Sequence, residues 1–431
     1  MAARGTFLNK RYGAYGHRDV PKEDEEMTHI GSGTPAGEYL RRFWQPVAFT
    51  DELTDLPKAI TILGEELVVF RDFSGNIGVL EAHCSHRGTS LEFGLVSQKG
   101  IRCCYHGWLF DVDGTILETP SEPAESTLKD RLCHGAYPVH EYSGIIFAYM
   151  GPGDKMPAFP MYDSFSRPGY KLIPGKQYYY PCNWLQILEN AMDPVHTAFL
   201  HTIVSGSQFT EEFGVVPEIQ YVQTSTGMMY VASRRVGDKV WVRMVENIFP
   251  NLQQVSPAWE DGKVEHGFDG PMMSRWIVPV DDTHTMFIEF RHVSETEETT
   301  PAWWADRDVM LPAQLPVSEI HEERQRQPTD YEAQVTQRAI AIHGLEHLGE
   351  SDRGVIMFRN IIRQGIQDVR DGKDPEGLSA KAGDFMPTFS NDTVVHAPKA
   401  ATEEEDRKLL LDIGLRLAEE YIENPPNLKD Q

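Results

Sequence analysis

Apolar and polar positions alternate along the first third of the chain, with the period of two that is typical of β-strands. The stretch AITILGEELVVFRD (59–72) alternates, FSGN (73–76) has the composition of a turn, and IGVLEA (77–82) resumes the pattern. GIIFAYMG (144–151) is the last apolar run before the Pro- and Gly-rich segment GPGDKMPAFPMYD (151–163). This pattern predicts an antiparallel β domain that ends near residue 155.

The rest of the chain mixes helical and strand-like patterns. A short helix is expected over 33–44, where Thr34 can cap it and Pro35 suits its first turn. Three longer segments are predicted to be helical: 184–201, 330–344 and 403–424. Residues 227–250 predict a hairpin that turns at Gly237-Asp238, and residues 284–293 predict a further strand.

A chain of 431 residues is longer than one compact core usually supports, so at least two domains are expected. We expect a polar arm and an entry helix in residues 1–44, a β domain in 45–155, and a larger domain of mixed type in 156–431. Strands and helices that are segregated in this way indicate an α+β protein.

Composition narrows the classes of function. The 65 acidic residues outnumber the 40 basic ones, and the formal net charge of -25 argues against a nucleic-acid partner. No apolar run is long enough to span a membrane, and the N-terminal sequence has no apolar core typical of a signal peptide. The five cysteines are too few and too unevenly spaced for a disulfide framework, so a cytoplasmic location is expected.

One group of candidate ligands consists of CSH at 84–86 and CCYH at 103–106. Each segment offers a thiol and an imidazole, whereas a zinc finger pairs cysteine with cysteine and histidine with histidine. Two facing loops of this kind would give one iron two cysteines and the other iron two histidines, which is the ligation of a Rieske-type [2Fe–2S] cluster. Zinc, and buried cysteines without a metal, remain the alternatives.

A second group lies in ENAMDPVHTAFLH (189–201). His196 and His201 are five residues apart, so a straight α-helix would separate their side chains by about 140° around its axis. They would converge on one ion only if the helix is bulged or ends there. By themselves these residues leave metal ligation and ordinary buried histidines equally open.

Both groups resemble motifs of one family, the Rieske non-haem iron aromatic-ring oxygenases, and in particular the terminal oxygenase (alpha) component of its phthalate dioxygenase-like branch. CSHRG and CCYHGW match the family pattern C-x-H-R-G followed by C-x-Y-H-G-W. The resemblance implies a [2Fe–2S] cluster with four ligands, Cys84, His86, Cys103 and His106. Cys104 then occupies the variable position, in agreement with the difficulty of bringing two neighbouring sulfurs to one small cluster.

The family also has the element N-x-x-D-x-x-H-x4-H, which Asn190, Asp193, His196 and His201 match. The resemblance implies that the two histidines and one distant carboxylate bind a mononuclear Fe(2+) with positions left open for O2 and substrate. Asp330 is the best candidate for that carboxylate. The alternatives are that Asp330 only caps a helix, or that one of three other residues is the ligand: Asp306, Asp308 and Asp352.

The resemblance further implies a catalytic domain of the helix-grip type, in which an antiparallel sheet is wrapped around helices. Asp193 would bridge His106, or less readily His86, of one subunit to His196 of the next, which implies a ring of subunits and most simply a homotrimer. Electrons would come from a separate reductase, directly or through a ferredoxin, because the chain has no flavin or nicotinamide fingerprint.

The substrate implied by the family is a small aromatic molecule, and an aromatic acid in the phthalate-type branch. Arginines on predicted strands could hold its carboxylate, with Arg234 and Arg243 as the main candidates beside Arg235 and Arg275. Ring dihydroxylation and O-demethylation both remain open. An alternative from another class, a Rieske electron-transfer protein without oxygenase activity, would need only the first group of ligands.

Overall fold

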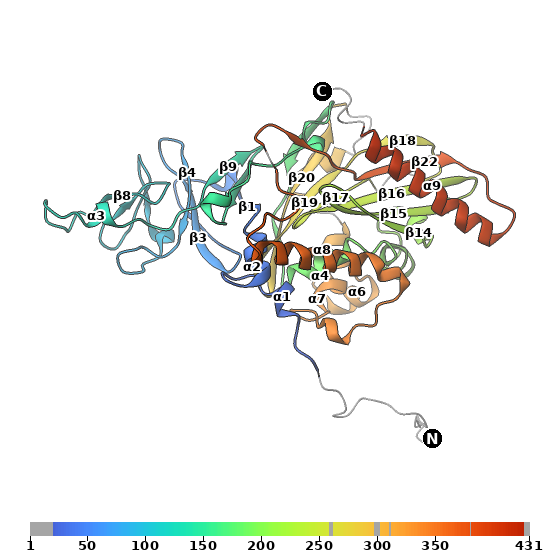
Figure 1. Cartoon of the computed structure of the whole chain (residues 1–431), viewed down its shortest axis with the longest axis horizontal. Coiled ribbons are helices and arrows are strands. Elements are labelled where there is room, and N and C mark those ends of the chain that lie inside the picture. The colour runs from blue at the N-terminus through green and yellow to red at the C-terminus, as the bar shows by residue number, and fades with distance from the viewer. Residues whose placement is uncertain (1–19, 258–261, 297–301, 310–311, 380, 426–431) are drawn as a thin grey trace, which may run out of the picture.

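The computed structural model describes residues 20–257, 262–296, 302–309, 312–379 and 381–425. A β-rich part, drawn in blue and cyan, projects from a larger part in which helices surround a broad sheet (Figure 1). The predicted α+β class is confirmed. No helix among the described residues has both the length and the apolar composition needed to cross a membrane.

The β-rich part consists of three small antiparallel sheets, ordered β1-β10-β9, β2-β3-β4 and β5-β6-β7-β8. Their strands are β1 (Trp44–Phe49), β2 (Lys58–Ile62), β3 (Glu65–Arg71), β4 (Ile77–Glu81), β5 (Leu95–Val96), β6 (Ile101–Arg102), β7 (Leu109–Phe110), β8 (Ile116–Glu118), β9 (Val139–Tyr142) and β10 (Ile145–Tyr149). The strands predicted from the alternation over 59–82 and 144–151 are therefore confirmed.

Three short helices accompany these sheets: α1 (Glu25–Thr28), α2 (Pro35–Leu40) and α3 (Leu128–Arg131). The expected entry helix is α2, and the Thr34 hydroxyl caps it by accepting a hydrogen bond from the Gly37 amide at 3.3 Å. This helix ends at Leu40, earlier than predicted. Residues 1–19 of the expected arm lie outside the described residues, and α1 forms in its remaining part.

The larger part is built on a ten-stranded sheet with the main order β12-β20-β19-β17-β16-β15-β14, to which β13, β18 and β22 are attached. A separate pair is formed by β11 and β21. The strands are β11 (Met161–Tyr162), β12 (Tyr170–Pro174), β13 (Tyr178–Tyr180), β14 (Glu218–Gln223), β15 (Gly227–Val236), β16 (Lys239–Ile248), β17 (Leu252–Val255), β18 (His266–Asp269), β19 (Met273–Asp281), β20 (His284–Ser294), β21 (Phe385–Met386) and β22 (Asn391–His396). The hairpin β15–β16 turns at Gly237-Asp238 as predicted.

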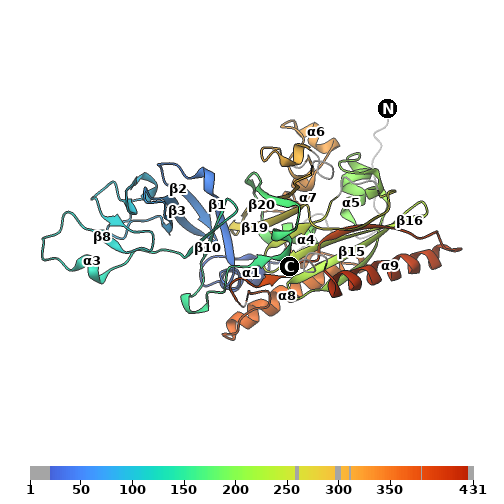
Figure 2. The same ribbon diagram turned by 90° about the horizontal axis from the view of Figure 1, so that it is seen from above.

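Helices pack against both faces of this sheet, as Figure 2 shows with α9 on one side and α6 and α7 on the other. They are α4 (Trp184–Asn190), α5 (His196–Ala198), α6 (His321–Arg326), α7 (Asp330–Val335), α8 (Arg353–Arg370) and α9 (Glu403–Glu423). Along β15, Met228 and Tyr230 belong to the core that includes α4, whereas Met229 and Val231 pack with α9. Because both faces are covered, the apolar residues of β15 do not alternate with polar ones.

Two helix predictions need correction. The segment 330–344 is α-helical only in α7, because the chain leaves the helix to bond with the start of α4: the Ala339 carbonyl accepts from the Asn183 amide at 2.8 Å. The segment 184–201 is not one helix either. It is interrupted between α4 and α5, where Asp193 and Pro194 form a turn, and the Asp193 carboxylate accepts a hydrogen bond from the Val195 amide at 2.9 Å.

Candidate active site

Two loops of the β-rich part, Cys84–Gly88 and Cys103–Gly107, have the same construction. In each loop the glycine amide donates a hydrogen bond to the carbonyl of the cysteine four residues earlier, at 2.8 Å and 3.1 Å respectively. Both glycines have φ near +75°, a conformation that side chains disfavour. The glycines of CSHRG and CCYHG are therefore needed to close two equivalent turns.

The side chains on these loops form the first candidate site. Cys84 and Cys103 are each only 3% exposed, and the rings of His86 and His106 lie edge to face with their centroids 4.6 Å apart. The Nδ1 atom of His86 is buried and has no hydrogen-bond partner in the described part of the chain. A buried imidazole nitrogen without a partner beside two buried thiols fits a metal ligand set. Cys104 is exposed and lies outside it.

Burial, together with the nearby Cys103, raises the pKa of the Cys84 thiol to about 11. The thiolate form therefore needs the positive charge of a metal, which deprotonates a coordinating thiol. Trp108 supports the site because its ring stacks on His86 with centroids 4.8 Å apart. His134, which was not predicted from the sequence, braces the first loop: it contacts the Ser85 hydroxyl at 2.6 Å and the Glu81 carbonyl at 2.8 Å.

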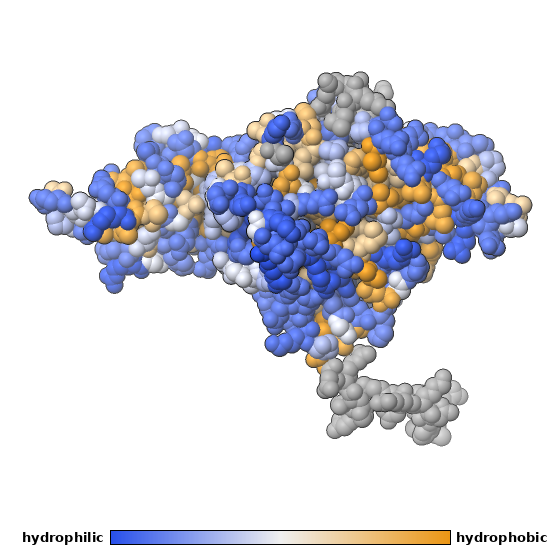
Figure 3. Space-filling model, in the orientation of Figure 1, coloured by the Kyte–Doolittle hydropathy of each residue, from blue (hydrophilic) through white to orange (hydrophobic). Residues whose placement is uncertain are grey.

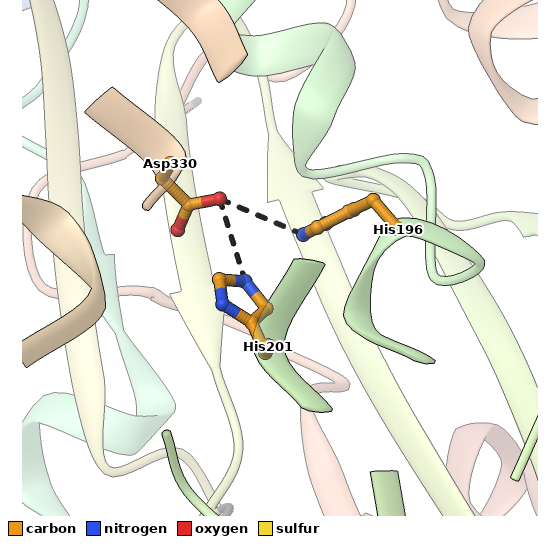
Figure 4. A group of neighbouring side chains, drawn as sticks. All are labelled: His196, His201 and Asp330. Atoms are coloured by element: carbon orange, nitrogen blue, oxygen red, sulfur yellow. Dashed lines mark ion pairs between the residues drawn. The ribbon is translucent and has the colours of Figure 1, made fainter. Parts of the chain in front are cut away.

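The second candidate site lies in the larger part, where α5 begins at His196 and continues into the π-helix η5 (Phe199–Val204). A π-helix repeats its hydrogen bonds at i→i+5. Residues five apart are therefore brought to the same side, and His196 and His201 face one point, as Figure 4 shows. The five-residue spacing of the two histidines requires a helix that departs from straight α-helical geometry, and the π-helix provides this departure.

Asp330, the first residue of α7, points between the two imidazoles (Figure 4). Its Oδ1 atom lies 3.4 Å from Nε2 of His201 and 3.7 Å from Nε2 of His196. The three side chains form one of the groups in the described residues whose ligand atoms all lie within 4.8 Å of one another. The helix cap is the neighbouring Thr329. None of the other three candidate aspartates belongs to this group: Asp306, Asp308 and Asp352.

The electrostatics favour a cation between these side chains. Burial raises the pKa of Asp330, but His201, His196 and Asn190 together outweigh burial and bring that pKa down to about 2, so the carboxylate is ionised. Burial lowers the pKa of His196, whereas for His201 the effect of burial is outweighed by the Asp330 carboxylate, which raises the pKa. A metal ion bound at the two Nε2 atoms takes the place of a proton on these nitrogens. The protein then offers this ion two imidazoles and one carboxylate with a charge of -1.

Neighbouring groups fix the orientation of the trio. The Nδ1 atom of His201 donates to the Gln208 side-chain carbonyl at 2.7 Å, and Nδ1 of His196 donates to the Asp193 backbone carbonyl. Both histidines thus present Nε2 to the centre of the site, because a hydrogen bond at Nδ1 fixes the orientation of each ring. Gln208 was not anticipated from the sequence, because nothing in the local pattern distinguishes it from a surface glutamine.

A cavity of about 230 Å³ opens onto the trio. Its wall combines apolar side chains with a few polar groups, a composition typical of sites for small organic molecules. The apolar residues include Ile187, Phe209, Phe213, Val245, Val255 and Phe287, and the polar ones include Gln208, Gln253, Gln314, Tyr230, Arg243 and Arg275.

Of the four arginines considered, Arg243 and Arg275 line the cavity. Arg234 does not: its guanidinium is buried and donates to the Thr197 hydroxyl at 2.8 Å and to the Val215 carbonyl at 3.0 Å. Arg234 thereby holds the start of α5. Arg235 points to the opposite face of the sheet, where it pairs with Asp406 of α9 at 2.6 Å.

The charges of the two cavity arginines are balanced differently. Arg275 forms an ion pair with Glu289 at 3.1 Å. Arg243 donates to the Tyr230 hydroxyl at 2.6 Å and to the Ser256 carbonyl at 3.0 Å, and no carboxylate of the described residues lies within ion-pair distance of it. The cavity wall therefore carries a buried positive charge whose partners, among the residues that the structure describes, are neutral oxygen atoms.

Residues 43–140 match the Rieske [2Fe-2S] domain family. The chain is 41% identical to the tert-butanol monooxygenase / tert-amyl alcohol desaturase oxygenase subunit of Aquincola tertiaricarbonis, over 93% of this chain and 89% of that protein. It is 38% identical to the phenoxybenzoate dioxygenase subunit alpha of Ectopseudomonas oleovorans, over 88% and 94% respectively. Among solved structures, dicamba monooxygenase bound to dicamba has a similar fold, with a TM-score of 0.57, 17% identity, and coverage of 78% of this chain and 99% of that one.

These relatives extend through both parts of the molecule and are oxygenase subunits, so the alternative of an electron-transfer protein without oxygenase activity is not supported. The enzyme carries a Rieske [2Fe–2S] cluster and a mononuclear iron, and it needs a separate protein to supply electrons. The chain therefore belongs to the Rieske non-haem iron oxygenases and is an oxygenase (alpha) subunit of the phthalate dioxygenase-like branch.

Proposed function

We propose that the enzyme oxidises an aromatic acid with O2 at a mononuclear Fe(2+) held by His196, His201 and Asp330. The observation that carries this proposal is the convergence of these three side chains at the wall of a partly apolar cavity. A ferrous ion held by two histidines and one carboxylate on one side supplies the chemistry of O2 activation. Cys84, His86, Cys103 and His106 are the proposed ligands of the cluster that delivers electrons to it.

The charge distribution of the cavity supports an anionic substrate. Arg243 is 5% exposed, and its described partners are a hydroxyl and carbonyl groups rather than a carboxylate. A buried cation is costly unless an anion or several good acceptors compensate it, so a substrate carboxylate beside Arg243 would complete its partners. The named substrate of one relative, phenoxybenzoate, has such a group, whereas the tertiary alcohols named for the other relative do not.

Replacement of Arg243 by methionine is expected to raise KM for an aromatic acid about 10- to 100-fold, because a hydrogen bond to a charged group is lost. The methyl ester of the same acid should be converted by the mutant and the wild type with similar KM. Arg235→Met is the matched control, since Arg235 faces α9 on the other side of the sheet. An equal loss for acid and ester in Arg243→Met would show that Arg243 supports the fold and not carboxylate recognition.

The reaction itself is tested by turnover under ¹⁸O₂ with an electron-donating reductase and a methoxylated aromatic acid. The placement of the substrate relative to the iron determines which bond is attacked. Release of formaldehyde would establish O-demethylation, and a labelled cis-diol would establish ring dihydroxylation. Reducing equivalents consumed without any oxidised product, across a panel of aromatic acids, would refute the proposed substrate class.

For the electron route we propose a head-to-tail homotrimer in which Asp193 of one subunit meets His106 of the next. Hydrophobic side chains are exposed in the two regions that this contact would join, the cluster loops and the π-helix. Phe93, Leu95 and Tyr105 are exposed near the cluster loops, and Phe199, Ile203 and Val204 are exposed on the π-helix. Figure 3 shows hydrophobic patches on the projecting β-rich part and also on the larger part. Exposed apolar residues of this kind are typical of protein interfaces.

Asp193 is suited to such a bridge because its carboxylate is partly free. One oxygen accepts from the Val195 amide at 2.9 Å, and the other lies 3.9 Å from Nδ1 of His196, with 32% of the side chain exposed. The exposed edge could accept a hydrogen bond from the outer nitrogen of a neighbour's His106. Since the Asp193 backbone carbonyl already orients His196, a carboxylate that also bonds to His106 of the neighbour would connect the two metal sites through one residue.

Asp193→Asn is therefore expected to leave the cluster and the iron bound but to slow electron transfer between them by about tenfold or more. The measurement is single-turnover oxidation of the pre-reduced cluster in the presence of substrate and O2. Glu211→Gln, a nearby charge-neutralising change on the surface, serves as the control. An unchanged rate in Asp193→Asn would refute the bridge.

The electron donor is proposed to be a cytoplasmic reductase, acting directly or through a ferredoxin. No flavin- or nicotinamide-binding fingerprint is present in the sequence, and the relatives are named as single subunits of larger enzymes.

A further inference from the structure

The two oxygens of Asp330 have different surroundings. Oδ1 faces both imidazoles, and it also accepts a hydrogen bond from the Asn190 side-chain amide at 3.2 Å. Oδ2 accepts a hydrogen bond from Nε2 of Gln314 at 2.6 Å. A carboxylate held in this way offers one oxygen to an ion between the histidines, while the other oxygen is turned toward Gln314.

Gln314 ends the short helix η8 (Pro312–Gln314), and both ends of its side-chain amide are engaged. The amide nitrogen donates to Asp330, and the amide oxygen accepts from Nη1 of Arg275 at 2.6 Å. A guanidinium can only donate and an ionised carboxylate can only accept, so these partners fix the orientation of the amide. A hydroxyl group, that of Tyr180, also donates to the backbone carbonyl of Gln314 and holds the residue in place.

Arg275 connects this arrangement to the cavity. Its Nε atom pairs with Glu289 at 3.1 Å, but Nη2 has only the Met273 thioether as a partner in the described part of the chain, at 3.0 Å. Sulfur is a weak acceptor, and both Arg275 and Met273 line the cavity. The Nη2 group is thus the place where an anionic part of a ligand would gain most from bonding to this guanidinium.

A polar chain therefore runs from the cavity wall through Arg275 and Gln314 to the outer oxygen of Asp330. We propose that Gln314 is a positioning residue that keeps Oδ2 of Asp330 turned away from the two imidazoles, so that Oδ1 is the oxygen that would hold iron, and that it couples carboxylate binding at Arg275 to the binding of the metal. This inference rests on the proposed iron site and substrate class, and it takes Arg275 as a second cavity guanidinium that a substrate carboxylate meets, in addition to Arg243. A ligand carboxylate that draws the guanidinium of Arg275 toward itself changes the hydrogen bond between Arg275 and Gln314. The hydrogen bond from Gln314 to Asp330 changes with it.

The coupling is testable by EPR spectroscopy of the intact protein, with the cluster oxidised, Fe(2+) bound, and nitric oxide as a probe of the mononuclear iron. In the wild type, addition of 3-phenoxybenzoate is expected to shift the nitrosyl signal, and its uncharged amide should not. In Gln314→Leu we expect iron to bind about tenfold more weakly, as is usual when a metal ligand loses a hydrogen-bond partner. The carboxylate should then no longer shift the signal.

Gln314→Glu separates the two bonds, because a carboxylate can still accept from Arg275 but is repelled by Asp330. It is expected to weaken iron binding at least as much as Gln314→Leu. Gln253→Leu is the matched control: Gln253 is another cavity glutamine, placed beside Arg275 in the sheet, and its loss should leave iron affinity unchanged. Far-UV circular dichroism and the midpoint of thermal unfolding report that each variant is folded.

The outcomes are distinguishable. Wild-type iron affinity in both Gln314 variants, or a carboxylate-induced shift that persists in Gln314→Leu, would overturn the role of Gln314. A wild-type signal that does not respond to the carboxylate would overturn the coupling. Absence of a nitrosyl signal in the iron-loaded wild type would instead refute the iron site on which the proposed function depends.

Discussion

Asp330→Ala is expected to lose the mononuclear iron and all oxygenase activity while the Rieske cluster remains. The reason is that Asp330 supplies the only negative charge of the trio, and its Oδ1 atom lies between the two imidazoles at 3.4 Å and 3.7 Å. Loss of a hydrogen-bond partner of a metal ligand already costs about 10- to 100-fold in metal affinity, so loss of the ligand itself should exceed that range. Iron analysis should fall from three to two irons per chain, with the visible cluster spectrum unchanged.

The control for this prediction is Asp308→Ala. Asp308 was a competing candidate for the third ligand, but its side chain is 79% exposed and it makes an ion-pair contact with Lys176 at 4.0 Å. Its loss should leave three irons and normal activity. Retention of the third iron in Asp330→Ala, or its loss in Asp308→Ala, would show that the ligand has been assigned to the wrong carboxylate.

The adjacent cysteines are expected to behave in opposite ways. Cys103→Ser should lose the cluster, and with it the entry of electrons, because Cys103 is buried opposite Cys84 on the second of two equivalent loops. Cys104→Ser should keep the cluster, because Cys104 is exposed and lies outside the ligand set. The visible absorption of the cluster and turnover with a reductase measure both effects.

Cys133→Ser provides a further control, since Cys133 is the other exposed cysteine of the β-rich part. Cys103→Ser should retain the mononuclear iron, because that site lies in the larger part of the molecule and shares no ligand with the cluster. A cluster that survives in Cys103→Ser, or disappears in Cys104→Ser, would reverse the assignment of the doublet.

Local sequence patterns were sufficient for elements whose structure depends on near neighbours. Alternation identified β2, β3, β4 and β10 of the β-rich part, Gly237-Asp238 identified the hairpin, and the helical pattern over 403–424 identified α9. The two Cys/His segments could be recognised for the same reason, since each is a short turn closed by its own glycine. Such features are encoded within about ten residues and change little with tertiary context.

Patterns failed where distant segments compete with local hydrogen bonds. The helix expected over 330–344 stops at Val335 because Gln186 of α4 donates to the carbonyls of Gln334 and Arg338. These bonds replace those that would continue the helix. Propensity is a weak preference compared with tertiary contacts of this kind.

The sequence by itself determined which side chains are able to bind metal, whereas the tertiary structure decided which of them meet. Asp330 is 129 residues beyond His201, and only the packing of α7 beside α5 and the π-helix brings the two together. The same holds for the arginines: Arg235 reaches α9 while its neighbour Arg234 points to the other face, because successive side chains of a strand alternate. Gln208 and Gln314 have no local signature at all, since their role consists entirely of hydrogen bonds to residues that the fold places beside them.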